Sequence, residues 1–297
     1  MELKAHAISV QGPHAPMLHA TSICVSDHQL VLLAGYPGPG HVALALGLSG
    51  RLHPNGGDVQ LDGDASGRVL RRRVAVVDTP GITEPDDALP VQTIVGEELA
   101  IAGRKAGRKA VEAWLAEHGW DAFAGRRFEH LPVGVRTEML AELTVARPEV
   151  KFVILTMPDR LGGDPHEWYA VGEELASRGY GVIITCADAS ARLLGVEAAQ
   201  LGSVNQPEPV RVEPVAAEAP AETVAAAVPT EAEVGPVEAG QAVAEEADAV
   251  PEKAGAADAV PEKAVTEGAD AVAEKAGGAV GEEPAGATVV DEKKDEA

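Results

Sequence analysis

Short runs of apolar residues recur along the front of this 297-residue chain, separated by charged or glycine-rich stretches. Such runs are typical of strands that are buried on both faces of a sheet. The segment Asp58–Gly63 alternates instead between apolar and polar residues, as expected at the edge of a sheet. The predicted buried strands are Leu30–Ala34, Val74–Val77, Phe152–Leu155 and Gly181–Thr185.

Segments with the apolar spacing of helices lie between these strands. The clearest is His166–Ser177, because Gly179 follows it as a stop signal. Strands that alternate with helices predict an α/β domain with a largely parallel sheet. The predicted helices are Val42–Leu52, Glu97–His118, Thr137–Ala146 and His166–Ser177.

The composition changes abruptly near residue 205. Residues 206–297 contain no aromatic residue and carry 22 acidic and 6 basic side chains, a net charge of −16, whereas residues 1–205 have a net charge of −7. A segment with so few large apolar side chains cannot offset its chain entropy. We therefore predict a folded domain over residues 1–205 and a disordered acidic tail, rich in Ala, Glu, Pro and Val, over residues 206–297.

Charge and hydropathy exclude several classes of protein. The acidic balance disfavours a nucleic-acid partner. No signal-peptide pattern opens the chain, and its apolar runs are far shorter than the ~20 residues of a membrane span, so we expect a cytoplasmic protein. Cys24 and Cys186 stand among apolar residues and are expected to be buried thiols rather than a disulfide.

A glycine-rich turn follows the strand Leu30–Ala34 and precedes a helix, which is the setting of a phosphate-binding loop. A working loop ends in Lys, which grips the β- and γ-phosphates, and then in Ser or Thr, which binds Mg²⁺. Here His41 and Val42 hold those two places. We therefore interpret the turn as a degenerate nucleotide-binding loop. Its residues are Gly35, Tyr36, Pro37, Gly38, Pro39, Gly40, His41 and Val42.

The segment after this loop is more specific. Leu48–Gly63 reads Leu-Ser-Gly-Arg-Leu-His-Pro-Asn-Gly-Gly-Asp-Val-Gln-Leu-Asp-Gly, and it resembles the ATP-binding domain of ABC transporters, where an apolar helix ends in Leu-Ala-Gly-Leu-x-x-Pro-x-x-Gly before a strand ending in Asp-Gly. Asp87–Ala100 resembles the phrase that opens the helical subdomain of that family. The resemblance covers about residues 1–195. It implies an α/β, P-loop NTPase-like (ABC-type) mixed sheet with flanking helices and a small helical subdomain at about 97–135.

The chemically demanding positions of the family have changed. Leu131–Arg136 stands at the signature position and keeps only Leu131 and Gly134, and the D-loop-like segment Leu161–Pro165 keeps Asp164. The resemblance implies that the glutamine of the Q-loop, the Walker B aspartate and glutamate, and the switch histidine have been lost. The residues near or at those places are Asp78, Thr156, Met157 and Ala187. We therefore expect no catalytic residue and no ATP hydrolysis.

Other candidate sites are weaker. His14 with His19, or Asp159 with Asp164 and His166, offer metal-ligand types at short spacing, but such loops are usually just solvated, so no metal site is predicted. The basic run Gly103–Lys109 is expected to be a solvated helix face that could also contact a membrane protein's cytoplasmic loop or acidic lipid headgroups.

The resemblance implies an ABC transporter ATP-binding subunit-like protein with degenerate motifs, acting as a non-hydrolysing docking or regulatory partner. The implied partner is a membrane permease or a partner ATPase. The implied location is the cytoplasm, including the inner face of the membrane. A homodimer or a heterodimer is also compatible with the resemblance. The alternative is a weak ATP-binding or ATPase subunit in which His41 takes over the role of the phosphate-gripping lysine. ATP would then be the cofactor, and Mg²⁺ would bind only together with ATP. A lesser alternative is a degenerate GTPase-like protein, because Asp78-Thr-Pro-Gly81 resembles the GTPase switch motif.

Overall fold

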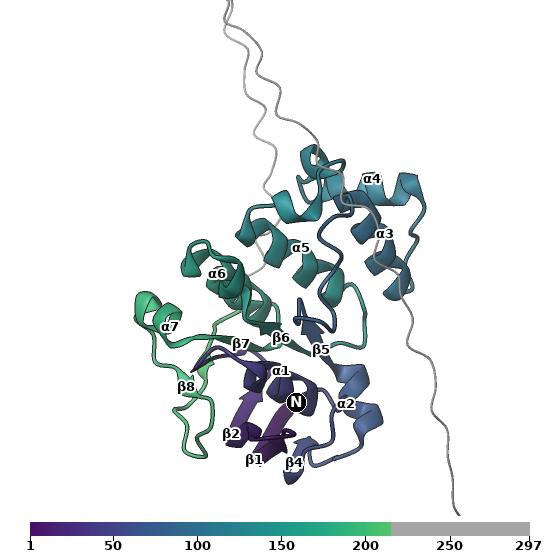
Figure 1. The fold of residues 1–297 in the computed structure, drawn as a ribbon. Coiled ribbons are helices and arrows are strands. Elements are labelled where there is room, and N and C mark those ends of the chain that lie inside the picture. The colour runs from purple at the N-terminus through teal and green to yellow at the C-terminus, as the bar shows by residue number, and fades with distance from the viewer. Residues whose placement is uncertain (215–297) are drawn as a thin grey trace, which may run out of the picture. The chain divides into compact units, whose positions relative to one another are not determined.

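The computed structural model describes residues 1–214; residues 215–297, which fall in the predicted disordered tail, lie outside the described part. Two sheets form its framework (Figure 1), an antiparallel sheet in the order β2-β1-β4 and a larger sheet in the order β5-β6-β7-β3-β8, with β9 paired to β3. The strands are β1 (Glu2–Gln11), β2 (Pro16–Ser26), β3 (Gln29–Gly35), β4 (Gly56–Leu61), β5 (Val74–Val77), β6 (Phe152–Thr156), β7 (Gly181–Ala187), β8 (Ala199–Gln200) and β9 (Val210–Arg211).

Helices cover both faces of the larger sheet. The α-helices are α1 (Pro39–Leu48), α2 (Gly67–Arg73), α3 (Val91–Ile101), α4 (Arg108–Glu117), α5 (Val133–Val145), α6 (Pro165–Ser177) and α7 (Asp188–Leu194). Short 3₁₀ turns are η1 (Asp121–Phe123), η2 (Phe128–His130) and η3 (Pro158–Leu161).

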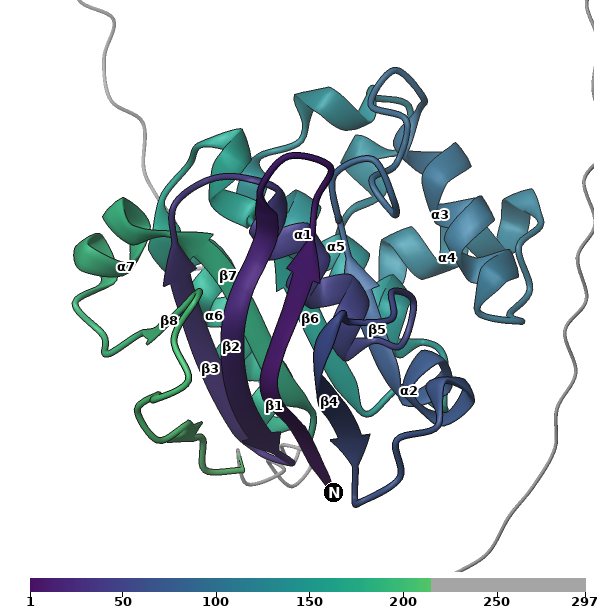
Figure 2. The ribbon, with the colours of Figure 1, turned by 60° about the horizontal axis from the view of Figure 1, so that its bottom comes forward.

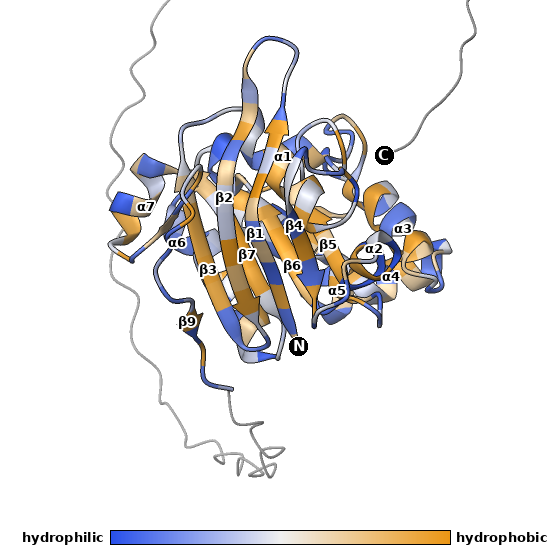
Figure 3. Cartoon of the chain, turned by 90° about the horizontal axis from the view of Figure 1, so that it is seen from below, coloured by the Kyte–Doolittle hydropathy of each residue, from blue (hydrophilic) through white to orange (hydrophobic). Residues whose placement is uncertain are grey.

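The larger sheet is apolar on both faces, as parallel strands between two layers must be. Along β3, Leu30, Leu32 and Ala34 pack into one core, whereas Val31 and Leu33 pack into the other. Strands β3, β6 and β7 are accordingly hydrophobic along most of their length (Figure 3). One core lies under α5 and α6, and the other lies under α1 and the antiparallel sheet (Figures 1 and 2).

Helix α1 lies between the two sheets and contacts β1 and β2 on one side and β5 and β6 on the other. A helix enclosed in this way needs apolar or small residues all round rather than on one stripe. Its sequence, Pro-Gly-His-Val-Ala-Leu-Ala-Leu-Gly-Leu, meets that need, and even its one polar side chain, His41, is fully buried.

The mixed α/β architecture with flanking helices confirms the predicted fold class. The four predicted buried strands are β3, β5, β6 and β7, and each boundary differs from the prediction by at most two residues. Strands β1 and β2 were not predicted. Their alternation is interrupted, since β1 buries Leu3 and Ala5 and then Ile8 and Val10, and Ala7 between them has a φ of 49°. This bulge-like irregularity shifts the side-chain parity, which hides the strand from a search for strict alternation.

Three predicted helices need correction. Glu97–His118 is wrong as a single helix: α3 ends at Ile101 and α4 begins at Arg108, because Gly103 turns the chain with a φ of 69°. Helix α5 begins at Val133 rather than Thr137, and α1 begins at Pro39 rather than Val42 and ends at Leu48 rather than Leu52.

The folded part extends beyond the predicted boundary at residue 205. Strand β9 pairs with the start of β3, where Leu30 faces Val210 and Gln29 faces Arg211. The Val212 amide also donates to the His28 carbonyl at 2.9 Å. Too short to show a pattern of its own, β9 is a strand only because the edge of β3 is available to pair with it. Over residues 1–214, no helix is long and apolar enough to cross a membrane.

Candidate functional site

The loop Gly35–Val42 lies where β3 ends and α1 begins. The outer half of the loop faces solvent, and the Tyr36 side chain is 86% exposed. Gly38 is the N-cap of α1 with an extended backbone (φ 165°), and Pro39 takes the first helical position, where its missing N–H costs no helical hydrogen bond. The predicted strand–turn–helix arrangement is therefore present.

Two of the loop's glycines are required by packing within the chain. A Cβ at Gly35 would lie 2.6 Å from the Leu201 Cβ, and one at Gly40 would lie 2.9 Å from both the Met17 carbonyl oxygen and the Leu201 Cδ2. Leu201 is held there because its amide donates to the Ala34 carbonyl at 2.8 Å. Only Gly38 has open space, with no atom within 4 Å of a Cβ built there. The glycines at 35 and 40 thus have a structural explanation that needs no phosphate.

His41 points back beneath the loop. Its Cε1 lies 3.5 Å from a Cβ position built on Gly35, and the side chain is fully buried. Neither ring nitrogen has a hydrogen-bond partner among the described residues. Burial lowers the pKa of His41, and this outweighs the raising effects of backbone groups of Tyr36 and Gly35 and of Asp159. The imidazole is therefore neutral near pH 7 and supplies no cationic charge to the loop.

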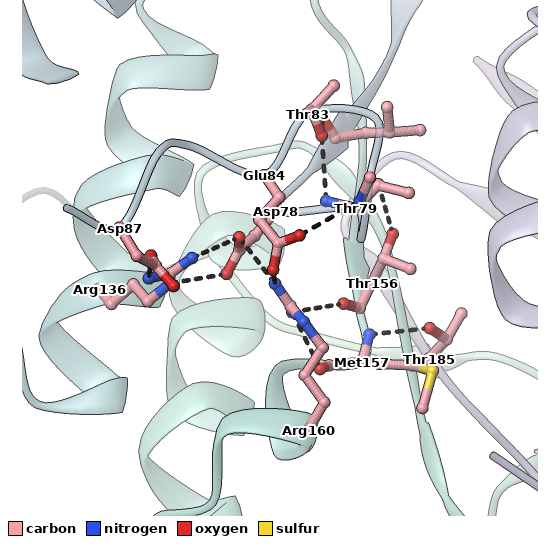
Figure 4. Close-up of polar contacts among 12 residues, drawn as sticks. Asp78, Thr79, Thr83, Glu84, Asp87, Arg136, Thr156, Met157, Arg160 and Thr185 are labelled. Atoms are coloured by element: carbon pink, nitrogen blue, oxygen red, sulfur yellow. Dashed lines mark hydrogen bonds and ion pairs between the residues drawn. The ribbon is translucent and has the colours of Figure 1, made fainter. Parts of the chain in front are cut away.

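The carboxyl ends of β5, β6 and β7 meet at one edge of the sheet (Figure 4). Thr79 and Thr156 share a buried hydrogen bond of 2.9 Å between their hydroxyls. The Met157 amide donates to the Thr185 carbonyl at 3.0 Å and to its hydroxyl at 3.1 Å. The ends of β6 and β7 are thus joined by hydroxyl and amide groups, and Thr156 and Met157 bring no carboxylate to this edge.

Asp78 and Arg136 form a buried ion pair at the same edge. The guanidinium donates from Nε at 2.9 Å and from Nη2 at 3.0 Å to the two carboxylate oxygens, and both side chains are less than 10% exposed. Arg136 also bonds Asp87, and its guanidinium stacks on the ring of Phe128 at 4.7 Å. The bidentate contact fixes the start of α5 against the end of β5.

A second arginine closes the network. Arg160 approaches the Asp78 carboxylate to 2.9 Å and that of Glu84 to 3.1 Å. The same side chain donates to the Thr156 and Met157 carbonyls, each at 3.2 Å. Asp78 and Met157, with φ values of 50° and 49°, are in a left-handed conformation that is costly for residues with a Cβ. The network holds both residues in this conformation.

The residues predicted at the signature and D-loop positions have packing and capping contacts. Leu131 is buried in the core. A Cβ on Gly134 would lie 2.7 Å from the Glu167 Oε2, so the glycine allows α5 to approach α6 closely. Asp164 caps α6, accepting from the His166 amide at 3.0 Å. These two segments adjoin, whereas the loop Gly35–Val42 belongs to α1 on the opposite face of the sheet (Figure 1).

Asp78, Val42 and the last residues of β6 supply no Mg²⁺ ligand. The Asp78 carboxylate is held by two arginines, Val42 offers no oxygen ligand, and β6 ends without a carboxylate. The first carboxylate after β6, that of Asp159, accepts through Oδ2 from the Ala187 amide at 2.8 Å and the Ser190 hydroxyl at 2.7 Å. Within residues 1–214, no group of three or more His, Cys, Asp or Glu side chains is arranged to hold a metal ion.

Sequence reasoning identified Asp78 as a replaced position and as part of a GTPase-like motif, and it did not predict its pairing with Arg136 and Arg160. Arg136 lies 58 residues from Asp78 in the sequence, and a buried arginine has no local signature. The one available signal is that Arg136 follows apolar residues at the start of a helix, α5, most of which is buried.

Compared by sequence, the chain matches no family model and no curated protein. Compared by structure, it resembles ATP-binding cassettes of ABC transporters. A dimeric bacterial ABC transporter cassette matches with a TM-score of 0.54 and 14% identity over 71% of this chain and 99% of that one. A nucleotide-free ATP-binding cassette from an ABC transporter matches with a TM-score of 0.53 and 16% identity over 72% of this chain and 92% of that one. The described part of the chain therefore has the fold of an ABC transporter ATP-binding cassette.

Proposed function

We propose that this cassette-like domain is a non-hydrolysing subunit that docks on a membrane permease or a partner ATPase and regulates it. It would act in the cytoplasm, at the inner face of the membrane. The observation that carries the proposal is the Asp78–Arg136–Arg160 network, which fills the edge of the sheet with internal ion pairs. The domain keeps the cassette fold, but internal ion pairs occupy the edge of the sheet where hydrolysis would take place. This combination suits a role in binding a partner rather than in hydrolysing ATP.

Hydrolysis needs groups that this edge does not offer. Phosphoryl transfer depends on cations placed against the phosphates and on a residue that orients the attacking water. Arg136 and Arg160 lie at the strand ends, and both are neutralised by carboxylates of the chain itself. His41 is buried and held neutral, so it does not stand in for a lysine.

A weak ATP-binding subunit is the second candidate, and one observation favours it. The outer half of the loop is open: Gly38 has free space around it, and the exposed Tyr36 ring is available to a ligand. Helix α1 also directs its first amides toward this space, although Pro39 contributes none.

A GTPase-like protein is the least favoured candidate. Asp78 follows β5, which is three strand positions from β3 and therefore about 14 Å away at ~4.8 Å per strand. A switch aspartate has to act beside the phosphate loop, and Asp78 is instead committed to Arg136 and Arg160.

Titration of the full-length protein with ATP and Mg²⁺ in a calorimeter, alongside a phosphate-release assay, separates the candidates. We expect no saturable heat and no phosphate release above background. Gly38→Asp places a negative charge in the open outer half of the loop, and Gly125→Asp is the matched control on an exposed turn without close neighbours. Micromolar, Mg²⁺-dependent binding that Gly38→Asp abolishes and Gly125→Asp preserves would establish the weak ATP-binding subunit instead.

The docking role needs its own experiment. The full-length chain, immobilised and exposed to detergent-solubilised membranes of its source cells, is expected to retain a polytopic permease or an ABC ATPase, identified by mass spectrometry. Retention should persist when ATP and Mg²⁺ are removed with a chelator, because the proposed contact does not depend on nucleotide. Recovery of neither class of protein would contradict the docking role.

A further inference from the structure

Four arginines line a hollow at the end of the sheet opposite to the glycine-rich loop. Arg51 follows α1, Arg71 and Arg72 lie in the last turn of α2, and Arg147 follows α5. The hollow has a volume of about 380 Å³ and opens beside the start of β5. Three separate elements thus place cationic groups around one space.

The charge in this hollow is not balanced by carboxylates of residues 1–214. Glu149 is the only carboxylate in its lining, and it is engaged by Arg72, whose Nε donates to Oε2 at 2.9 Å. In the described part of the chain, no carboxylate lies within 4.0 Å of Arg51, Arg71 or Arg147. Glu98 acts on Arg147 only from beyond that distance. Burial lowers the pKa of Arg51, and the charges of Arg147 and Arg71, which line the same hollow, lower it further.

Backbone carbonyls hold these side chains in place. Arg51 donates from Nη1 to the Val74 carbonyl at 3.1 Å, and Arg71 donates from Nη1 to the Gly50 carbonyl at 2.8 Å. Arg147 donates from Nε to the carbonyl of Thr144 at 3.2 Å. A guanidinium has five N–H donors, so each arginine is anchored by one nitrogen while other donors remain for a ligand. Anchored donors lose less conformational entropy when a ligand binds.

The chemistry of the hollow favours phosphate over a carboxylate. Several arginine forks match the multiple oxygens and double charge of a phosphate group. The space is larger than a phosphate alone, and its remaining walls are apolar, formed by Ala75, Ile101, Pro148 and Val150. Ile101 is 63% exposed, so it presents apolar surface at the hollow. The ligand class is therefore a phosphate group attached to a partly apolar remainder.

We propose that the hollow lined by Arg51, Arg71 and Arg147 binds a phosphate-bearing anion, at a site separate from the glycine-rich loop. The phosphate could belong to a soluble metabolite or to a lipid headgroup, since both present the same group to the arginines. The inference does not depend on the proposed docking function, because it uses different residues at the other end of the sheet.

Calorimetric titration of the full-length protein with inorganic pyrophosphate at low ionic strength tests the site. We expect saturable binding near one equivalent, weakened about tenfold or more by Arg71→Gln and by Arg147→Gln, because each removes charge-assisted hydrogen bonds. Arg192→Gln makes the same change of charge on the exposed face of α7 and should leave binding unchanged. Arg71→Lys, which keeps the charge but loses the fork, should bind with intermediate affinity. If Arg147→Gln does not fold, as judged by circular dichroism, Arg71→Gln still tests the site, because Arg71 is exposed.

Sedimentation with phosphatidylcholine vesicles, with and without a phosphoinositide, distinguishes the two sources. Vesicle binding that needs both the phosphoinositide and Arg71 identifies a lipid headgroup, and pyrophosphate binding without vesicle binding identifies a soluble ligand. Either result supports the site. Absence of saturable pyrophosphate binding overturns the proposal, and so does an equal loss in Arg192→Gln, which would indicate a diffuse charge effect. Loss through Gly38→Asp would place the anion at the loop and overturn it as well.

Discussion

The Asp78 carboxylate and the Arg136 guanidinium make a two-point contact of 2.9 and 3.0 Å in the interior of the protein. Removing one member of a buried pair leaves the other charge without compensation, which typically costs about 3–5 kcal/mol. We therefore expect Asp78→Asn to lower the free energy of unfolding by about that amount, measured by urea denaturation. The double variant Asp78→Asn with Arg136→Met should recover part of the loss, because it no longer buries the Arg136 charge without a full partner.

Arg108→Gln is the control for that measurement. It breaks the i,i+4 ion pair with Glu112, in which the Arg108 side chain is 89% exposed, and such pairs contribute little to stability. If Arg108→Gln and Asp78→Asn had equal effects, the Asp78 network would not be a structural element.

Gly40 and Gly38 should respond differently to alanine. Alanine normally stabilises a helix relative to glycine, but a Cβ at Gly40 would press on the Met17 carbonyl at 2.9 Å. We expect Gly40→Ala to destabilise the domain by about 1–3 kcal/mol through overpacking. Gly38→Ala should be nearly neutral, since its φ of 165° is extended backbone and its surroundings are open. Chemical denaturation of both variants checks this, and a loss confined to Gly38→Ala would contradict the packing explanation.

His41 should make the domain sensitive to acid. Its pKa in the folded protein is lowered by burial, whereas in the unfolded chain it is ~6.5. The unfolded state therefore binds more protons, so the contribution of His41 is complete above about pH 6.5 and is lost as the pH falls toward the folded-state pKa. His41→Leu, which has no titrating group, should weaken the fall in melting temperature below that pH.

The matched control is His130→Gln, because the His130 side chain is 64% exposed. It should leave the acid sensitivity of the wild-type protein in place. Melting curves across pH 5–8 provide the comparison, and identical pH profiles for His41→Leu and the wild type would refute the assignment.

The two cysteines should react with a thiol reagent at different rates. Burial raises the pKa of Cys186 to about 12, so almost no thiolate forms at neutral pH. Cys24 is half-buried on β2, and burial raises its pKa as well. We expect slow labelling of Cys24 and none of Cys186 until the protein is unfolded. Absorbance with an aromatic disulfide checks this, and Cys24→Ser should remove the native-state reaction; rapid labelling of Cys186 would contradict its burial.

The parallel strands could be predicted from the sequence because each is a continuous apolar run with glycine or charged residues around it. Strand β1 could not, since the irregularity at Ala7 breaks its alternation. The short strand β9 exists only by pairing with β3. The break between α3 and α4 lies in a run of small and basic residues, Gly103–Lys109, inside a segment whose helical spacing predicts a single helix.

The candidate site also has features that could be predicted from the sequence and features that could not. The identity of the groups at the strand ends can be read along the chain, so the absence of lysine at 41 and of carboxylates at 156 and 157 is evident without the structure. What those positions contact becomes known from the fold. The fold joins Asp78 to Arg136 and Arg160, and sets Leu201 against the loop glycines. The physical reason is that strand ends and loop residues acquire their partners from segments distant in the chain, and periodicity along a sequence carries no information about such contacts.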